Sequence, residues 1–139
     1  MKLLYALIVA LFCIHPAHAD TINFSPVVGP CTGTACLPFV SDNPAYAISS
    51  ITRSYDWSGL YVTLNGVTYS GIAPHTSTLI TPAPNYKALW HYDAIVLSSQ
   101  AGMRIVITLD AYYTRRLNRT GHNYYVYSWT VLAGVINTT

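Results

Sequence analysis

The stretch from Asn85 to Asp110, NYKALWHYDAIVLSSQAGMRIVITLD, contains two hydrophobic patterns that meet at Gly102. In the second pattern Ile105, Ile107 and Leu109 alternate with residues that point to the other side of an extended chain. A period of two is typical of a half-buried β-strand. The second half of the stretch is therefore predicted to be a strand.

The first half of the stretch has no such alternation. If this half were a strand, its apolar residues would lie on both faces: Ala88, Leu89, Trp90, Tyr92, Ala94, Ile95, Val96 and Leu97. On a helix, Lys87, His91 and Ser98 share one narrow polar stripe and the remaining surface is apolar, as in a helix that is covered on more than one side. Asn85 is a suitable N-cap and Gly102 a suitable C-terminal cap. We predict a helix over Tyr86 to Ala101, and the alternative is a long buried strand.

A hairpin is predicted on the N-terminal side of this stretch. Asn65-Gly66 lies between the alternating runs 60–64 and 67–70, and this dipeptide favours the type I′ turn of a two-residue hairpin. A first main strand is expected from Tyr46 to Ser54, with Ile48 and Ile51 facing inward around a bulge.

The rest of the chain completes a mostly β architecture. Residues 73–84 hold three prolines and are predicted to be a loop, and residues 112–121 an exposed basic connection. A last strand is expected from Tyr124 to about Ala133. The order of one strand, a hairpin, a helix and two strands is that of a five-stranded OB-fold barrel with a helix between strands 3 and 4. The alternative is a β-sandwich in which residues 86–98 form a strand.

The N-terminus is typical of an exported protein. Lys2, an apolar block and Ala17-His18-Ala19 indicate a signal peptide over residues 1–19, cleaved between Ala19 and Asp20 to give a secreted or periplasmic protein. Residues 20–44 are expected to be an irregular segment and residues 45–139 the barrel. Cys31 and Cys36 are predicted to form a disulfide that closes a small loop. No later apolar run is long enough to span a membrane as a helix.

The composition favours binding over catalysis. Only 9% of residues are charged, Glu does not occur, and Tyr occurs 12 times. Tyr offers an apolar face and a hydroxyl, which suits neutral polar ligands or subunit interfaces. The few acids and histidines form no catalytic or metal-ligand motif, so we expect no enzyme, no cofactor and no metal. Loss of Lys2 with the signal peptide lowers the formal charge from +2 to +1, which predicts no nucleic-acid binding.

Two segments resemble B subunits of bacterial A-B toxins with five B subunits, such as type II heat-labile enterotoxins, subtilase cytotoxin and typhoid toxin. Residues 99–105, SQAGMRI, resemble the passage from helix to strand, and residues 59–62, GLYV, with the hairpin after them resemble the second and third strands. The likeness covers Tyr46 to Ala133. It implies an OB barrel, a pentameric ring, a host glycan as ligand and a catalytic A subunit as partner. Lys87, His91 and Ser98 would then face a pore lined by helices.

This chain departs from those toxin subunits in the position of its cysteines, in a longer basic loop around Arg115 to Arg119, and at one ligand contact. Both of its mature cysteines precede the first main strand, whereas the toxin subunits usually carry a disulfide within the barrel. The serine that contacts sialic acid in the relatives of subtilase and typhoid toxin has no secure counterpart. The resemblance therefore implies glycan binding without a particular sugar.

The resulting hypothesis is a secreted, non-enzymatic subunit that binds a cell-surface glycan by stacking a sugar on an aromatic ring. The expected glycan-binding residues are Tyr46, Ser49, Tyr55, Asp56 and Trp57, with Arg115 and Arg116 as anion contacts. The competing hypothesis is a periplasmic or surface interaction protein built as a β-sandwich.

Overall fold

The computed structural model describes residues 19–28, 37–119 and 123–139. The predicted signal peptide, apart from its last residue, and the predicted Cys31–Cys36 disulfide lie outside these ranges. The described residues form nine strands and no helix. The strands are β1 (Thr21–Pro26), β2 (Phe39–Ser41), β3 (Ile48–Arg53), β4 (Gly59–Leu64), β5 (Val67–Ile72), β6 (Thr76–Thr81), β7 (Asn85–Ser98), β8 (Arg104–Asn118) and β9 (Tyr124–Thr138).

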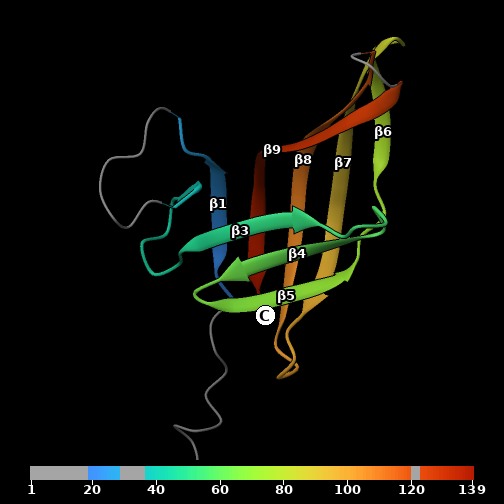
Figure 1. The fold of residues 1–139 in the computed structure, drawn as a ribbon. Helices are drawn as coiled ribbons and strands as arrows, with labels where there is room; N and C mark the ends of the chain where they lie inside the picture. The colour runs from blue at the N-terminus through green and yellow to red at the C-terminus, as the bar shows by residue number, and fades with distance from the viewer. Residues whose placement is uncertain (1–18, 29–36, 120–122) are drawn as a thin grey trace, which may run out of the picture.

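All nine strands belong to one antiparallel sheet that curls into a nearly closed barrel. The strand order is β2-β1-β9-β8-β7-β5-β4-β3, and β6 pairs with β7 off this path. In Figure 1, β3, β4 and β5 cross in front of β1, β9, β8 and β7, so the two ends of the sheet face each other across the core. A β-rich fold is confirmed, but the five-stranded OB barrel is not, and a sandwich of two separate sheets is not found either.

The central error of the sequence prediction is the helix over Tyr86 to Ala101. Residues 85–98 form β7, which pairs with β8 along its length from Asn85 opposite Arg116 to Ser98 opposite Arg104. Gly102 does have a positive φ of 85°, but it lies in the tight connection from β7 to β8 and caps no helix.

A β-bulge explains why the alternation in β7 was hidden. The register shifts between Tyr92 and Ile95, and Ala94 has a φ of 50°. A bulge adds one residue to a strand, so the side chains beyond it change faces. The buried residues are therefore even-numbered before the bulge, at Ala88, Trp90 and Tyr92, and odd-numbered after it, at Ile95 and Leu97.

A second bulge lies in β9, where it pairs with β8, close to the level of the bulge in β7. The register of β8 and β9 shifts between Asp110 and Ala111, which leaves Leu132 as the extra residue of β9. Bulges bend a strand and increase its twist. Two bulges flanking one stretch of β8 mark the level at which the long strands leave the barrel.

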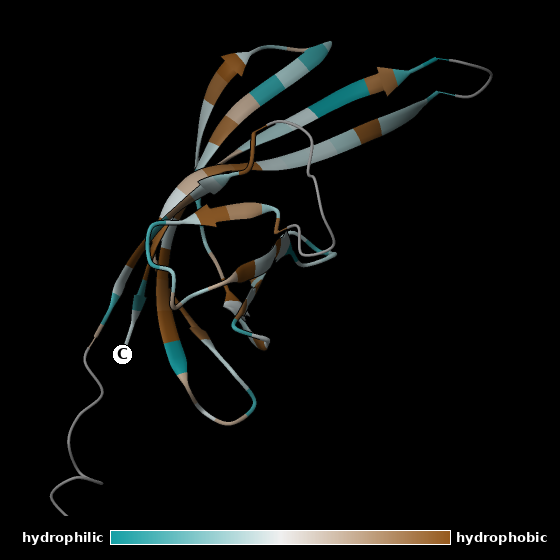
Figure 2. Ribbon diagram, turned by 90° about the vertical axis from the view of Figure 1, so that its left-hand side faces the viewer, coloured by the Kyte–Doolittle hydropathy of each residue, from teal (hydrophilic) through white to brown (hydrophobic). Residues whose placement is uncertain are grey.

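The parts of β6–β9 beyond the bulges form a four-stranded extension. We call "the extension" residues 76–81, 85–92, 111–118 and 124–131. In Figures 1 and 2 the β8–β9 hairpin projects well past the layer of β3, β4 and β5. The face of the extension that continues into the barrel core is its "inner face", and the opposite face is its "outer face".

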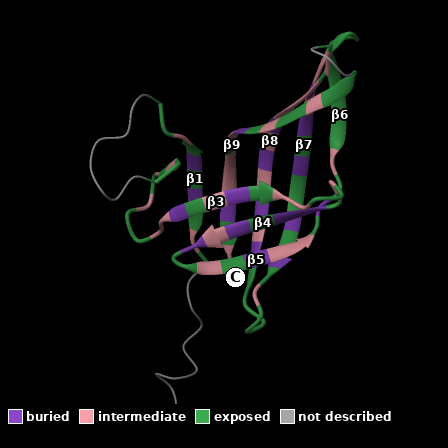
Figure 3. Cartoon of the chain, viewed as in Figure 1, coloured by how far each residue is buried: buried purple, intermediate pink, exposed green. Residues whose placement is uncertain are grey.

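The barrel core lies between the two crossed layers. The largest fully buried side chains come from strands of both layers: Ile22, Ile48, Leu60, Val62, Tyr92, Leu97, Ile105, Ile107, Leu109 and Ile136. Buried residues are accordingly concentrated in the barrel, and they become sparser toward the tip of the extension (Figure 3). Each of the three long strands therefore stabilises the barrel at one end and supports a less covered surface at the other.

Several shorter predictions are confirmed. β4 and β5 pair from Gly59 opposite Ile72 to Leu64 opposite Val67, and the predicted turn between them has positive φ at Asn65 and Gly66. β3 has the expected bulge, with Ile48 and Ile51 buried. The alternation of Ile105, Ile107 and Leu109 in β8 is as predicted.

Other segments are more regular than predicted. The expected loop over residues 73–84 contains β6, and the expected basic connection over residues 112–121 forms the last part of β8 up to Asn118. Residues 20–44 supply β1 and β2, and β1 pairs with both β2 and β9. None of the described residues forms a helix that is long and apolar enough to cross a membrane.

Candidate functional site

The inner face of the extension carries a continuous group of aromatic rings. Because paired strand residues share a face, Tyr86 opposite Arg115, Ala88 opposite Tyr113, and Tyr113 opposite Trp129 all lie on this side of the sheet. We call "the aromatic surface" the side chains of Trp57, Tyr86, Trp90, Tyr113, Tyr125 and Tyr127. Five of these rings come from β7–β9, and Trp57 comes from the connection between β3 and β4.

The rings contact one another in sequence from the barrel to the tip. Trp90 and Tyr113 stack with centroids 4.5 Å apart. Trp57 meets both edge-on, at 5.6 and 5.2 Å. Tyr127 lies 6.2 Å from Trp57 and 6.2 Å from Tyr125. These separations are within the range of favourable aromatic pairs.

Exposure of the rings increases toward the tip. Trp90 is only 8% exposed, whereas Tyr127 is 48% and Tyr125 54% exposed. The deeper rings therefore hold the outer ones in place, and the outer ones are accessible. Half-exposed tyrosines on a rigid sheet lose little entropy when they bind a ligand.

A strained turn places Trp57 on this surface. Trp57 has a φ of 67°, which is unusual for a bulky residue and costs of order 1–3 kcal/mol. The Ser54 side chain hydrogen-bonds to the Asp56 carboxylate at 2.7 Å, and Ser58 donates to it from both its backbone N–H (3.1 Å) and its hydroxyl (2.7 Å). These bonds, first among them that of Ser54, lower the pKa of Asp56 to about 2. Asp56 is thus occupied in holding the turn.

Two arginines border the aromatic surface. The Arg53 guanidinium lies 3.4 Å from the centroid of the Trp57 ring. The Arg115 guanidinium lies 5.3 Å from the ring centroids of both Tyr86 and Tyr125. Cations at these distances from aromatic rings are attracted by the ring quadrupole. They also supply hydrogen-bond donors beside the exposed rings.

The expected glycan-binding residues are thus divided among separate places. Trp57 and Arg115 share the aromatic surface through Tyr113 and Tyr127, and Tyr55, which is 97% exposed, precedes Trp57 in the turn. The others lie elsewhere: Ser49 lines a groove of about 390 Å³ beside Trp129 at the open seam of the barrel, and Arg116 lies on the outer face.

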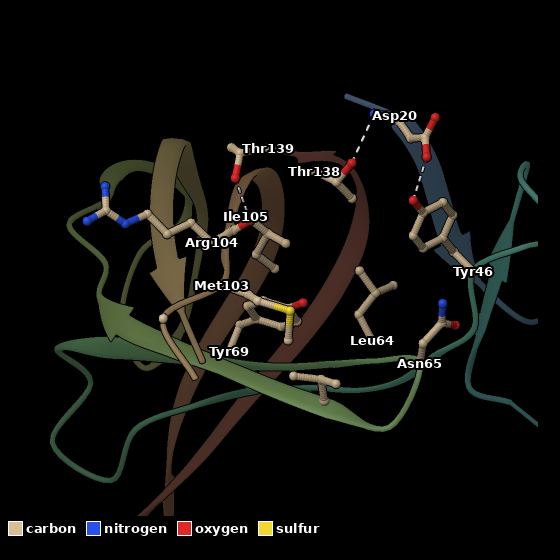
Figure 4. Close-up of a pocket in the computed structure, with 12 residues that line it drawn as sticks. Asp20, Tyr46, Leu64, Asn65, Tyr69, Met103, Arg104, Ile105, Thr138 and Thr139 are labelled. Carbon is tan, nitrogen blue, oxygen red and sulfur yellow. Dashed lines mark hydrogen bonds between the residues drawn. The ribbon is translucent and has the colours of Figure 1, made fainter. Parts of the chain in front are cut away.

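Tyr46 belongs to a cavity of about 800 Å³ at the opposite end of the barrel (Figure 4). Its hydroxyl donates to the Asp20 carboxylate at 2.5 Å, and this hydrogen bond raises the pKa of Tyr46. Leu64, Tyr69 and Met103 give the cavity apolar walls. Tyr46 and Trp57 therefore do not form one site.

The residues expected to face a pore lie on the outer face of β7. The His91 Nδ1 atom lies 2.6 Å from the Asp110 carboxylate, and the Lys87 ammonium lies 4.0 Å from the Tyr112 ring centroid. Ser98 pairs with Ser70 and Arg104 near the end of the strand. The predicted helix that was to carry Lys87, His91 and Ser98 around a pore is wrong, because residues 85–98 are a strand, and a pore-facing role of these residues stays an untested prediction.

The part of the chain that the structure describes contains no group of three His, Cys, Asp or Glu side chains able to hold a metal ion. The His91–Asp110 pair lies on the opposite face of β7 and β8 from the aromatic rings. The aromatic surface can therefore stack and hydrogen-bond a ligand, but its described residues offer no paired acid and base.

The sequence predicted a last strand from Tyr124 to about Ala133, but it did not indicate that Tyr125 and Tyr127 of that strand lie on one surface with Trp57. Tyr86, Trp90 and Tyr113 were not recognised, because residues 86–101 were assigned to a helix and the strand starting at residue 104 was ended before Tyr112. Continuing the period of two from Leu109 through Ala111, Tyr113 and Arg115 would have found this face.

Comparison with models of known protein families, with curated proteins and with solved structures found no match to this chain. The aromatic surface and the cavities are therefore interpreted from their own geometry.

Proposed function

We propose that this chain is a secreted, non-enzymatic protein that binds carbohydrate on the aromatic surface. The observation that supports the proposal is the row of aromatic rings. Trp90 and Tyr113 stack on each other at its inner end, and Tyr125 and Tyr127 are about half exposed at its outer end. A sugar ring has an apolar C–H face and polar edges, so it fits an aromatic ring bordered by hydrogen-bond donors.

The geometry accommodates more than one sugar unit. The Tyr125 and Tyr127 centroids are 6.2 Å apart, and the next ring, Trp57, is 6.2 Å from Tyr127. Consecutive rings at this separation offer stacking positions for neighbouring units of an oligosaccharide. Arg115, between Tyr86 and Tyr125, would orient the ligand by hydrogen bonding to its hydroxyl or acidic groups.

The proposal is confined to glycan recognition. Assembly as a pentameric ring and delivery of a catalytic A subunit were inferred from a resemblance that required a helix at residues 86–101, and these residues are extended up to Ser98. The glycan proposal does not depend on that resemblance, because it is supported by rings that lie on strands.

A glycan array with matched tyrosine variants tests the proposal. Tyr127→Ala should weaken binding at least about tenfold, since burying an aromatic side chain is worth about 1.5–3 kcal/mol. Tyr125→Ala should weaken binding in the same direction. Tyr124→Ala is the control, because Tyr124 is 51% exposed on the same strand but lies on the outer face.

The array results either support or exclude the aromatic surface as the binding site. Loss of binding in the Tyr125 and Tyr127 variants with retention in the Tyr124 variant supports the aromatic surface. Equal binding by all three variants and the wild-type protein, or no glycan bound by the wild type, would exclude it. Circular dichroism of each variant confirms that the sheet is intact.

A further inference from the structure

A second polar site lies on the outer face of the extension, behind the aromatic surface. A groove of about 530 Å³ is lined by nine residues, which include Thr81, Lys87, Thr114, Arg115, Arg116 and Ser128. Three of the nine are cations, and none carries a carboxylate. The groove was not foreseen in the sequence, where Lys87 was assigned to a helix and Arg116 to a loop.

Strand register places two of the cations next to each other. Lys87 pairs with Thr114, and Arg116 is two residues further along the same strand as Thr114. Such diagonal neighbours on one face have Cα atoms about 7–8 Å apart, within the reach of long side chains. The Lys87 ammonium lies over the Tyr112 ring at 4.0 Å, on the side of Thr114 away from Arg116, so its side chain must turn toward Arg116 for both cations to contact one anion.

Hydroxyl groups complete the groove. Thr81 pairs with Lys87 across one edge, and Ser128 pairs with Thr114 across the other. The hydroxyls of Thr114 and Ser128 hydrogen-bond to each other. The row Thr81, Lys87, Thr114 and Ser128 therefore presents donors from four adjacent strands to one small volume.

The cations have no carboxylate partner within this groove. The nearest acid by register on the outer face is Asp110, whose carboxylate lies 2.6 Å from the His91 Nδ1 atom. Arg115 is directed toward the Tyr86 and Tyr125 rings. Two like charges on adjacent strands repel unless an anion lies between them. The groove is thus built to receive negative charge.

We propose that this groove binds a tetrahedral oxyanion, as a sulfate or phosphate ester, between Lys87 and Arg116. Arginine offers paired N–H donors to two oxygens of such a group, and lysine supplies a point charge. The Thr81 hydroxyl and whichever of the Thr114 and Ser128 hydroxyls accepts from the other can donate to the remaining oxygens. The groove adjoins the aromatic surface at Tyr86 and Arg115, but Lys87 and Arg116 lie on the other face of the same strands.

A titration followed by nuclear magnetic resonance of the full mature chain tests the site. The probes are glucose 6-sulfate and glucose 6-phosphate, with glucose as the uncharged ligand of matched shape. Amide shifts should concentrate at residues 87, 114, 116 and 128 for an ester and be absent there for glucose. The ester that binds more tightly identifies which of the two groups the site prefers.

Charge variants complete the test. Lys87→Gln and Arg116→Gln should each weaken ester binding about tenfold or more, because a hydrogen bond to a charged group is being removed. Arg104→Gln, at an exposed position at the far end of β8, is the matched control and should bind like the wild type. Thermal melting checks that all three variants are folded.

Two results would overturn the proposal. One is wild-type shifts with the esters that do not exceed those with glucose. The other is an equal loss of ester binding in Arg104→Gln and Arg116→Gln, which would indicate attraction by net charge alone. Rescue of binding by Lys87→Arg, with loss in Lys87→Gln, would support a requirement for positive charge at this position.

Discussion

Trp57 joins the β3–β4 connection to the other rings of the aromatic surface. Its ring lies against Arg53 on one side and against Trp90, Tyr113 and Tyr127 on the other. The left-handed backbone that positions it is maintained by the Asp56 hydrogen bonds. One turn therefore links the stability of the barrel to the shape of the proposed site.

Replacing Trp57 should affect both properties, unlike replacing Tyr127. Trp57→Ala is expected to abolish glycan binding and to lower the free energy of unfolding by about 1.5–3 kcal/mol, the value of burying an aromatic side chain. Tyr127→Ala should lower binding with little change in stability. Urea denaturation measures the difference, and a Trp57 variant of wild-type stability would contradict the packing role.

His75 should make the protein less stable in mild acid. Its ring stacks on Trp90 with centroids 3.8 Å apart, and burial lowers its pKa below 6.5. The unfolded chain therefore binds the proton more readily than the folded chain, and stability must decrease as the pH falls below about 6.5. Urea denaturation on either side of that pH should show a smaller decrease for His75→Phe than for the wild type. Identical pH dependence in the two proteins would exclude His75 as the cause.

Gly134 shows where a strand cannot carry a side chain. A Cβ at this position would lie 2.4 Å from the Thr108 carbonyl oxygen and 2.6 Å from the Phe24 ring. Gly134→Ala should therefore destabilise the fold by about 1–3 kcal/mol, the usual cost of overpacking. Thermal denaturation tests this, and an unchanged melting temperature would mean that β1 and β8 can move apart from β9 at no cost.

At the scale of single elements, β7 shows both the strength and the limit of reading periodicity. The alternation in β8 and the Asn65-Gly66 turn could be predicted, because each pattern is local and uninterrupted. In β7 the buried residues are even-numbered before the bulge at Ala94 and odd-numbered after it. Each half alternates as a strand should, but the two halves together resemble a helix that is apolar nearly all round. A bulge forms only when a strand pairs with another strand, and this pairing cannot be predicted from the residues of one strand alone.

A pair of glycine substitutions tests the bulge. Ala94 has a φ of 50°, a conformation that glycine adopts without steric cost, so Ala94→Gly should raise the free energy of unfolding, by up to about 1 kcal/mol. Ala88 is fully buried in the regular part of β7, so Ala88→Gly should lower it by about 0.5–1 kcal/mol. Opposite signs support the bulge in solution, whereas destabilisation by both changes would argue for a regular backbone at Ala94.

At the scale of the whole molecule, the site is created by topology. Trp57 lies in the connection after β3, whereas Tyr113 and Tyr127 lie on the two longest strands, and their contacts exist only because the sheet curls until its two ends meet. Composition indicated a tyrosine-rich binding surface, but not which tyrosines form it. Of the expected residues, Tyr46 lies in the cavity at the opposite end of the barrel, and Ser49 lies in the separate groove beside Trp129.

The assembly state stays a prediction at this scale. The pentamer was inferred from toxin B subunits, and the part of that inference that placed helices around a pore no longer applies to residues 85–98. Sedimentation velocity of the purified protein measures the mass directly. A pentameric mass would require an interface made by strands, and a monomeric mass would leave the aromatic surface as the site of a single-chain binder.

We propose that sugar binds to the inner face of the extension and not in the cavity at the far end of the barrel. The most direct measurement is a map of amide and indole shifts on titration with an oligosaccharide selected from the glycan array. We predict that the shifts gather at Trp57, Tyr113, Tyr125 and Tyr127. Shifts centred instead on Tyr46, Tyr69 and Met103, with the aromatic surface unaffected, would contradict the account.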